Sequence, residues 1–518
     1  MKWRIPEQLT PAESRVANRI RKRSRFFLFL REIRHELFNE SFQHELIEAY
    51  APRGQDPVPP ALLAMVTLLQ AYTGASDADA VDAAEMDLRW QLVLGTVGQR
   101  NAPFGQGSLV RFRARVIEAN LDQRLLDRTV QLARESGKFG WQKLRVALDS
   151  SPISGSGRVE DGWNLIGHAM TKLVAVLSRA SGVDEAEIVE EAEASVLCGS
   201  SLKATLDIDW DDEAERSQAL GKVVEQAESL LRWANERVPH VMAAEIVVSA
   251  VAILRTVIAQ NTEPDPDSPG GRRVPEGVPA DRVCSVGDQE MRHGRKSKTR
   301  AFNGYKRHIA THVDAPIVLA AAALPANQPE NEAVPMLLDS IKHLGPIDEL
   351  FIDRGYVAND RVSELDKKGV PIRCRPWPEN NRSGLFTKGD FRIDFRRREI
   401  TCPAKHTIQY SATDLRAIFG AERCGPCPLR AQCTTAKAGR TVVVHPQERL
   451  LRKLKRRISS AVGRERLRLR VPVEHRLARI GTTQGTRSRY VGTRKNTLDL
   501  RRHSTIANLI ELQRAACA

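Results

Sequence analysis

The chain has 518 residues, which is too long for one ordinary domain and predicts two to four units with ample core. It carries 79 Lys and Arg against 64 Asp and Glu, and this net charge of +15 favours a polyanionic partner such as nucleic acid. The longest apolar stretch, 246–254, is far too short to span a bilayer, and no signal peptide is visible. These features exclude a membrane protein and predict a cytoplasmic one.

The N-terminal region is predicted to be entirely helical. Thr10 and Glu13 match a capping box that opens a helix towards Tyr50, and the last helix of the region is expected between Ser108 and Gly137. Several short helices followed by a basic one are compatible with helix-turn-helix DNA binding. A plain helical bundle with solvated arginines explains the same residues equally well.

The first predicted strand, 144–148, is apolar and is closed by an acid, Asp149. The small residues of 150–157 predict a loop that leaves room beside this carboxylate. Residues 163–260 then predict a helical insertion with a packing role, and the Pro- and Gly-rich stretch 261–283 predicts a long loop.

A dense basic stretch follows the loop. Its cations are interleaved with Phe302 and Tyr305, which predicts a phosphate-tracking surface, although a solvated loop is the alternative. The residues expected to contact DNA here are Arg295, Lys296, Lys298 and Lys306. Beyond them the pattern predicts two strands that pair across 313–316, and then a helix over 331–343.

A second strand that ends in an acid lies in the sequence ELFIDRGY, 349–356. The apolar run 350–352 is followed by Asp353 and then by a predicted helix over 359–368, with one more strand at 370–375. An acid at the carboxyl end of such a strand lies in the crevice where open α/β sheets bind ligands. Taken alone, Asp353 is explained as a turn residue, and Asp288 competes with Asp149 as the first acid.

Four cysteines cluster in a segment that breaks the α/β pattern. Cys424 and Cys427 form a C-x2-C pair, with Cys402 before it and Cys433 after it. This pattern fits tetrahedral coordination of a structural Zn²⁺ in a reducing compartment. His406 could replace one ligand, and four unliganded thiols are the alternative.

The C-terminal part is the most basic and contains a third acid. Pro472 suits the first turn of a helix, which places Glu474 near its start, with Val473, Leu477 and Ile480 on an apolar face. Taken alone, Glu474 is explained by the favourable interaction of an acid with a helix N-terminus.

Together these segments resemble the DDE transposases of bacterial insertion sequences, and the resemblance covers nearly the whole chain. The blocks that carry it are GASDADAVDAAEMDLRWQLVLG, HGRKSKTRAFNGYKRH, FIDRGY and RVPVEHRLARIGTTQGTRSRYVGTRKN. A related signature is Tyr, two residues, Arg, three residues, Glu, six residues, Lys. Arg470 and Glu474 fit it, whereas Leu467 and Gly481 replace the Tyr and the Lys. Arg479, Arg494 and Lys495 are substitutes for the missing phosphate contacts.

The resemblance implies a ribonuclease H-like α/β core with a mixed sheet and flanking helices. It also implies that Asp149, Asp353 and Glu474 are catalytic and hold two Mg²⁺, or Mn²⁺, for cleavage and strand transfer of double-stranded DNA. The partners would be the element's inverted-repeat ends and the target DNA, with a homodimer in the DNA complex and association with the nucleoid when bound. A non-catalytic DNA-binding protein derived from a transposase, and a nuclease that cuts without joining, are the rival interpretations.

The expected organisation has six parts. They are a helical DNA-binding domain (1–140), the first part of the catalytic core (141–162), a helical insertion with its loop (163–282), the central core (283–376), a small zinc-binding insertion (377–445) and the basic C-terminal core with the last acid (446–518).

Overall fold

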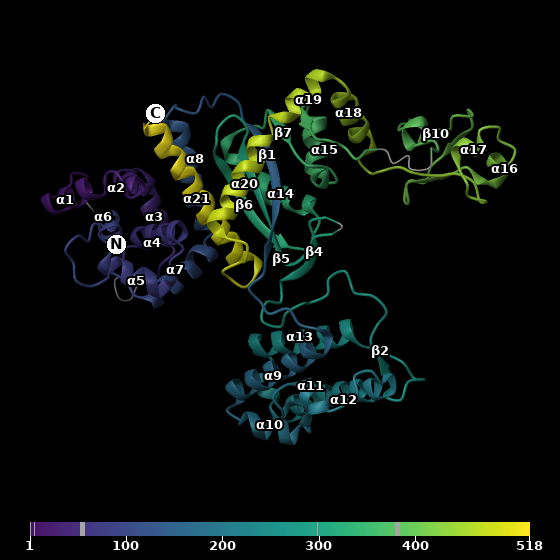
Figure 1. Cartoon of the computed structure of the whole chain (residues 1–518), viewed down its shortest axis with the longest axis horizontal. Helices are drawn as coiled ribbons and strands as arrows, with labels where there is room; N and C mark the ends of the chain where they lie inside the picture. The colour runs from purple at the N-terminus through teal and green to yellow at the C-terminus, as the bar shows by residue number, and fades with distance from the viewer. Residues whose placement is uncertain (1, 5, 52–56, 298, 379–383, 518) are drawn as a thin grey trace.

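The structure is a computed structural model, and it describes residues 2–4, 6–51, 57–297, 299–378 and 384–517. A curled mixed sheet lies at the centre (Figure 1). The N-terminal helices lie on one side of it, a second group of helices lies below it, and a small module with short strands extends from the far side. Within the described residues, no helix is long and apolar enough to cross a membrane.

The N-terminal region is helical, as predicted, but its helices are shorter than expected. The helix expected towards Tyr50 is three helices, because Asn39 accepts a hydrogen bond from the backbone N–H of Phe42 and so starts a new one. The helix expected over 108–137 is two, separated at Asn120, whose φ of 53° is left-handed. The elements are α1 (Pro11–Ile20), α2 (Arg25–Leu37), α3 (Glu40–Glu48), α4 (Pro60–Thr73), α5 (Asp77–Met86), α6 (Leu88–Leu94), α7 (Gln106–Glu118) and α8 (Leu121–Glu135).

The sheet confirms the predicted order of strand, hairpin, helix, strand, helix, strand. Its strands lie in the order β4-β5-β1-β7-β8, and β6 also pairs with β5. β1 runs antiparallel to β5 and parallel to β7, which is parallel to β8. The elements are β1 (Arg145–Ser154), β4 (Arg292–Arg295), β5 (Ala301–His312), β6 (Val318–Pro325), α14 (Ala333–Ile341), β7 (Glu349–Phe351), α15 (Asp360–Lys367) and β8 (Ile372–Arg373).

The two faces of the sheet are covered by different helices. Val146 and Leu148 on β1 belong to the large core shared with the N-terminal helices, whereas Ala147 between them packs with Val473 of α20 (Val471–Gln484). Because side chains alternate along a strand, Asp149 faces the same side as Ala147. This alternation places Asp149 under α20.

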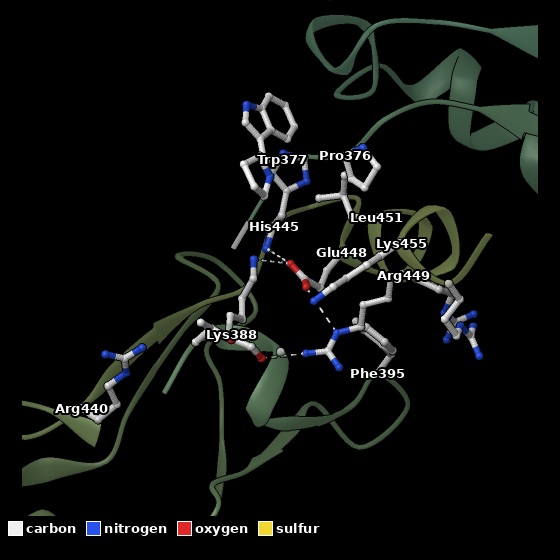
Figure 2. A pocket seen from close by; sticks show the side chains of 15 residues that line it. Pro376, Trp377, Lys388, Phe395, Arg440, His445, Glu448, Arg449, Leu451 and Lys455 are labelled. Carbon is white, nitrogen blue, oxygen red and sulfur yellow. Dashed lines mark hydrogen bonds and ion pairs between the residues drawn. The ribbon is translucent and has the colours of Figure 1, made fainter. Parts of the chain in front are cut away.

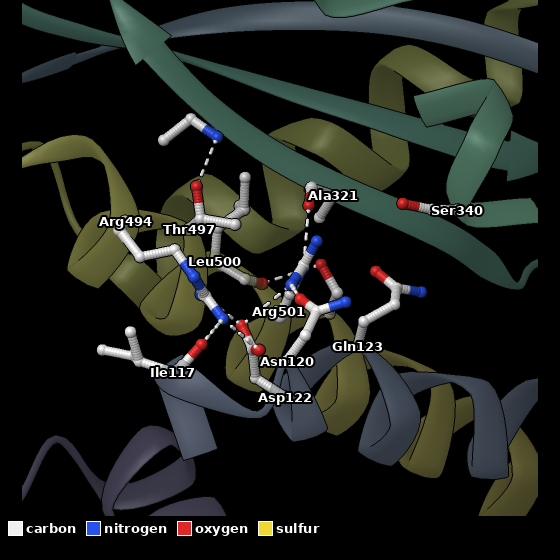
Figure 3. Close-up of polar contacts among 12 residues, drawn as sticks. Ile117, Asn120, Asp122, Gln123, Ala321, Ser340, Arg494, Thr497, Leu500 and Arg501 are labelled. Carbon is white, nitrogen blue, oxygen red and sulfur yellow. Dashed lines mark hydrogen bonds and ion pairs between the residues drawn. The ribbon is translucent and has the colours of Figure 1, made fainter. Parts of the chain in front are cut away.

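A buried ion network joins the N-terminal helices to the last helix, α21 (Thr493–Cys517) (Figure 3). The carboxylate of Asp122, which is only 2% exposed, lies 2.7 Å from Nη2 of Arg494 and 3.0 Å from Nη1 of Arg501. Arg501 also donates to the carbonyl oxygen of Ala321 in β6. Asp122 therefore ties α8 to α21 and, through Arg501, to the sheet.

The predicted helical insertion has its own hydrophobic core. It comprises α9 (Gly162–Ser181), α10 (Glu185–Glu191), α11 (Leu202–Leu206), α12 (Glu213–Arg237) and α13 (Glu245–Asn261), followed by the short strands β2 (Glu263–Pro264) and β3 (Arg272–Arg273).

The cysteine-rich module holds β9 (Arg392–Asp394), β10 (Glu399–Thr401), β11 (Thr407–Gln409), β12 (Arg416–Ile418), α16 (Gly420–Cys424), α17 (Arg430–Cys433) and β13 (Thr441–Val443). The chain returns to the sheet through α18 (Glu448–Ser459) and α19 (Ala461–Arg468). Short 3-10 turns occur at Ser195–Leu197, Pro239–Val241, Glu330–Glu332, Lys342–Leu344, Arg354–Tyr356 and Lys388–Asp390.

Candidate active site

Asp149 lies within β1 and not at its end, so the predicted strand boundary is wrong. The strand continues to Ser154 because β5 pairs with it as far as Gly304. The loop expected over 150–157 therefore starts only after Ser154. The side chain of Asp149 is still available from the α20 side, at 11% exposure.

Asp353 lies two residues beyond Phe351, the last residue of β7, so the strand ends one residue earlier than predicted. In the parallel pairing of β1 with β7, Ala147 lies opposite Phe351. Two residues beyond this pair, Asp149 is still in β1 and Asp353 is just past the end of β7, so the parallel pairing brings the two acids to neighbouring positions. Glu474 comes from above, in the first turn of α20, whose apolar face is buried as expected.

Arg470 joins the three acids through one guanidinium group. Its Nη2 lies 2.7 Å from Asp149, and its Nη1 lies 2.7 Å from Asp353 and 3.6 Å from Glu474. The Arg470 side chain is 11% exposed, whereas those of Asp353 and Glu474 are 54% and 60% exposed. Asp353 and Glu474 are thus open to solvent, whereas Arg470 and Asp149 between them are largely buried.

The electrostatic environment is unfavourable to an ionised Asp149. The pKa of this carboxyl is raised to about 6, mainly by burial and also by the neighbouring charges of Asp353 and Glu474. Arg470 and the backbone N–H of Ser150 act in the opposite direction and lower it. Such a site gains from a cation of higher charge than Arg470 supplies.

The donor set fits Mg²⁺ in chemical type, because hard divalent cations prefer carboxylate oxygens. Within the described residues, however, no group of three or more His, Cys, Asp or Glu side chains is close enough to hold a metal ion as placed. The guanidinium of Arg470 explains this spacing, since it lies between the three carboxylates. Direct coordination by all three acids therefore requires Arg470 to move.

Glu330 is a fourth acid beside this cluster, and sequence reasoning missed it. It accepts a hydrogen bond of 2.6 Å from Oγ of Ser150, the residue after Asp149. A Cβ at Gly355 would lie 2.1 Å from its Oε2, so the carboxylate packs on the backbone two residues beyond Asp353, where only glycine leaves room. The one visible signal was its place before a predicted helix, where acids are common for other reasons.

The turn that follows Asp353 is packed through a buried aromatic pair. Tyr356 and His308 are fully buried, and the Tyr356 hydroxyl lies 2.9 Å from Nδ1 of His308. Burial lowers the pKa of His308 to about 3, so this imidazole is neutral at ordinary pH. Tyr356, unassigned from the sequence, is therefore a packing residue of the turn that carries Asp353.

Asp288, the competing first acid, lies in a different environment. It is fully buried, accepts a 2.5 Å hydrogen bond from the hydroxyl of Tyr305 and also accepts one from the backbone N–H of Gly492. Asp288 thereby fixes the start of α21 against β5.

The residues predicted to contact DNA divide into two groups. Arg295, Lys296 and Lys495 are exposed. The others have internal partners: Lys306 donates to the carbonyl of Gln328, Arg479 pairs with Glu511, Arg494 pairs with Asp122 and Arg470 pairs with the three acids. Lys298 lies outside the described residues. Arg494 thus has a structural partner, and its phosphate contact stays a prediction.

The four cysteines come together in the small module. Cys402, Cys424, Cys427 and Cys433 line one narrow pocket with His406. Burial raises the pKa of the Cys433 thiol, and the other three thiols add to this effect. The four thiols thus line the same pocket, although among the described residues they do not form a group close enough to hold a metal ion.

Two protein families match the chain. A Transposase domain (DUF772) matches residues 14–115, and a Transposase DDE domain matches residues 401–513. Each match covers about a fifth of the chain. The second contains the four cysteines, Arg470 and Glu474, but neither Asp149 nor Asp353. No curated protein and no solved structure matches.

The two matches indicate a DDE-type transposase of an insertion element. The DDE match implies a ribonuclease H-like fold, and the mixed sheet with its flanking helices agrees with that class.

Proposed function

We propose that this protein binds the terminal inverted repeats of its element and catalyses Mg²⁺-dependent DNA strand cleavage and strand transfer. One observation carries the proposal: acids from β1, the end of β7 and α20 converge on the guanidinium of Arg470. Three carboxylates gathered from distant parts of the sequence repel one another unless a cation neutralises them. A cation-binding role explains their convergence better than a packing role does.

Asp149, Asp353 and Glu474 would hold the ions, two Mg²⁺ or Mn²⁺. Bound there, the ions would activate the attacking oxygen and stabilise the departing 3′ oxygen. Arg470 would then release the three carboxylates and bind the scissile phosphate, because a guanidinium group binds phosphate as well as it binds carboxylate. Glu330, through Ser150 and the backbone at Gly355, fixes the positions of Asp149 and Asp353 and acts as a positioning residue.

The reaction has two displacements at phosphorus. In the first, a water oxygen bonds to phosphorus and the P–O3′ bond breaks, leaving a 3′-OH at the element end. In the second, that hydroxyl oxygen attacks a target phosphodiester, and the target's 3′ oxygen leaves and takes up a proton. Neither step needs a covalent bond between protein and DNA.

The remaining parts of the proposal concern binding and assembly. The helical region 1–140 would bind the element ends, and Arg295, Lys296 and Lys495 would contact phosphates because their side chains are exposed. The four cysteines would hold one structural Zn²⁺. A homodimer in the DNA complex stays a prediction.

The test is cleavage of DNA that carries the element ends by the purified full-length protein. We expect nicks ending in 3′-OH with Mg²⁺ and none with EDTA. Asp149→Asn should lower the rate by about 10³-fold, since loss of a metal ligand removes several kcal/mol of transition-state stabilisation. The control Glu465→Gln changes an exposed acid of α19 and should cleave normally. Full activity in Asp149→Asn would refute the assignment of this residue.

The same assay separates the two rival functions. Specific binding of the element ends without cleavage under any divalent cation would identify a DNA-binding derivative. Cleavage without joining to a target plasmid would identify a nuclease.

A further inference from the structure

A cleft of about 730 Å³ lies where the cysteine-rich module meets α18 (Figure 2). Its walls come from the segment around Trp377, from the module at Lys388 and Phe395, and from α18. None of the three acids of the candidate active site lines it. Its volume lies in the range of pockets that hold nucleotide-sized ligands, roughly 300–1,000 Å³. The cleft is therefore a second candidate site.

The cleft is strongly cationic. Its lining includes the six cations Lys388, Arg440, Arg449, Arg452, Lys455 and Arg456, against one carboxylate. That carboxylate, Glu448, is buried and lies 2.5 Å from Lys388 and 3.3 Å from Arg452, so its charge is neutralised internally. Arg449 and Arg456 are exposed. The surplus positive charge favours an anionic ligand.

The cleft also presents a flat aromatic surface. The Trp377 side chain is 48% exposed, and its ring centroid lies 6.4 Å from that of His445 at a tilt of 42°. Burial lowers the pKa of His445, and the charge of Lys388 lowers it further, so this ring is uncharged at neutral pH. On the opposite wall, the guanidinium of Arg449 lies 5.4 Å from the Phe395 ring.

We propose that this cleft binds unpaired nucleotides of single-stranded DNA, with a base stacked on Trp377 and the adjoining phosphates on Arg449 and Arg456. Stacking platforms combined with a cationic groove are the general means of binding single strands without reading their sequence. Paired bases cannot use this site, because their faces are covered by their neighbours in the duplex. The inference rests on the proposed function only in taking DNA as the substrate.

The test measures binding of a fluorescent oligothymidine, and of a duplex of the same length, to the full-length protein in EDTA. Trp377→Ala should weaken oligothymidine binding about tenfold, the size expected for the loss of one stacked base. Duplex binding should not change. Trp377→Phe keeps an aromatic face and should restore most of the affinity.

The phosphate contact has its own matched pair of variants. Arg449→Gln should make the slope of log affinity against log salt concentration shallower for oligothymidine. The change should be the size expected for the loss of about one phosphate contact. The control Arg397→Gln changes an exposed arginine of the same module outside the cleft and should leave the slope unchanged.

Two results with the Trp377→Ala variant would overturn the cleft as a single-strand site. One is equal oligothymidine affinity for wild type and Trp377→Ala, and the other is an equal loss of single-strand and duplex binding. A wild type that binds oligothymidine through Trp377 but never cleaves DNA would overturn the proposed function and leave the cleft in place. A wild type that cleaves DNA but does not bind oligothymidine would overturn the cleft and leave the proposed function in place.

Discussion

Arg470 is the cation that pairs with all three carboxylates, so removing it should lower the stability most when no divalent cation is bound. Arg470→Ala leaves Asp149 partly buried beside two like charges, and we expect a loss of about 2 kcal/mol in unfolding free energy, allowing for the exposure of the other two acids. Millimolar Mn²⁺ should restore much of this loss. Thermal unfolding with Mn²⁺ and with EDTA measures both effects.

The matched control is Arg468→Ala, an exposed arginine two residues away. It should unfold like wild type under both conditions. Equal stability of Arg470→Ala and wild type in EDTA would show that the three acids do not depend on Arg470.

His503 provides a test of pH dependence at a single buried residue. Burial lowers its pKa to about 4, and Arg502, Arg307 and Arg489 act in the same direction against Asp499. The folded state disfavours the protonated ring, so the free energy of unfolding is highest above pH 6.5. It should fall by up to about 3 kcal/mol as the pH falls from about 6.5 to 4.

The measurement is the unfolding free energy against pH for wild type and His503→Asn. The unfolding free energy of His503→Asn should fall less steeply below pH 6.5 than that of wild type. That of His44→Asn, which changes an exposed histidine, should fall as steeply as wild type. An unchanged slope in His503→Asn would assign the acid sensitivity to other groups.

At the scale of elements, Asp122 should determine how firmly the N-terminal helices hold α21. Asp122→Ala leaves Arg501 buried without its carboxylate partner, and breaking a buried pair costs about 3 kcal/mol. Denaturant unfolding measures the loss, with the exposed Glu118→Ala in α7 as control. A loss no larger than that of the control would mean that apolar packing alone joins the two parts.

The cysteine-rich module should carry one Zn²⁺ per chain. Metal analysis of protein purified without chelator should find it, and Cys427→Ser should lose it, whereas Cys198→Ser in the helical insertion should not. Metal analysis of His406→Ala tests whether this histidine is a ligand, since loss of zinc is expected only if it is one. Wild-type protein without zinc, or Cys427→Ser with its full complement, would count against the site.

Across the whole molecule, the strands next to Asp149 and Asp353 were predictable because each contains a short apolar run followed by an acid. Glu474 was placed correctly in the first turn of its helix, and Asp353 lies one residue further beyond its strand than predicted. The end of β1 was not predicted, because Ser150, Ser151 and Ser154 are small and polar and Pro152 lies among them. The strand conformation of this segment comes from pairing with β5, far along the sequence.

Two polar contacts of the fold could not be predicted from the sequence, for a related reason. Neither the role of Glu330 nor the pairing of Arg494 with Asp122 has a local signal, since each depends on contacts between segments more than 100 residues apart. A basic residue in a basic segment predicts DNA binding by charge alone, and only the fold shows that Arg494 is used internally.

The most direct test of the central claim is whether the three acids bind a divalent cation. Mn²⁺ titration of the full-length protein, followed by electron paramagnetic resonance, should detect binding in wild type and a loss of at least about tenfold in affinity for Asp353→Asn, which lacks one charged ligand. Asp339→Asn, which changes an acid of similar exposure on α14, should bind like wild type. Equal Mn²⁺ affinity for Asp353→Asn and wild type would contradict the assignment of this cluster as the metal site.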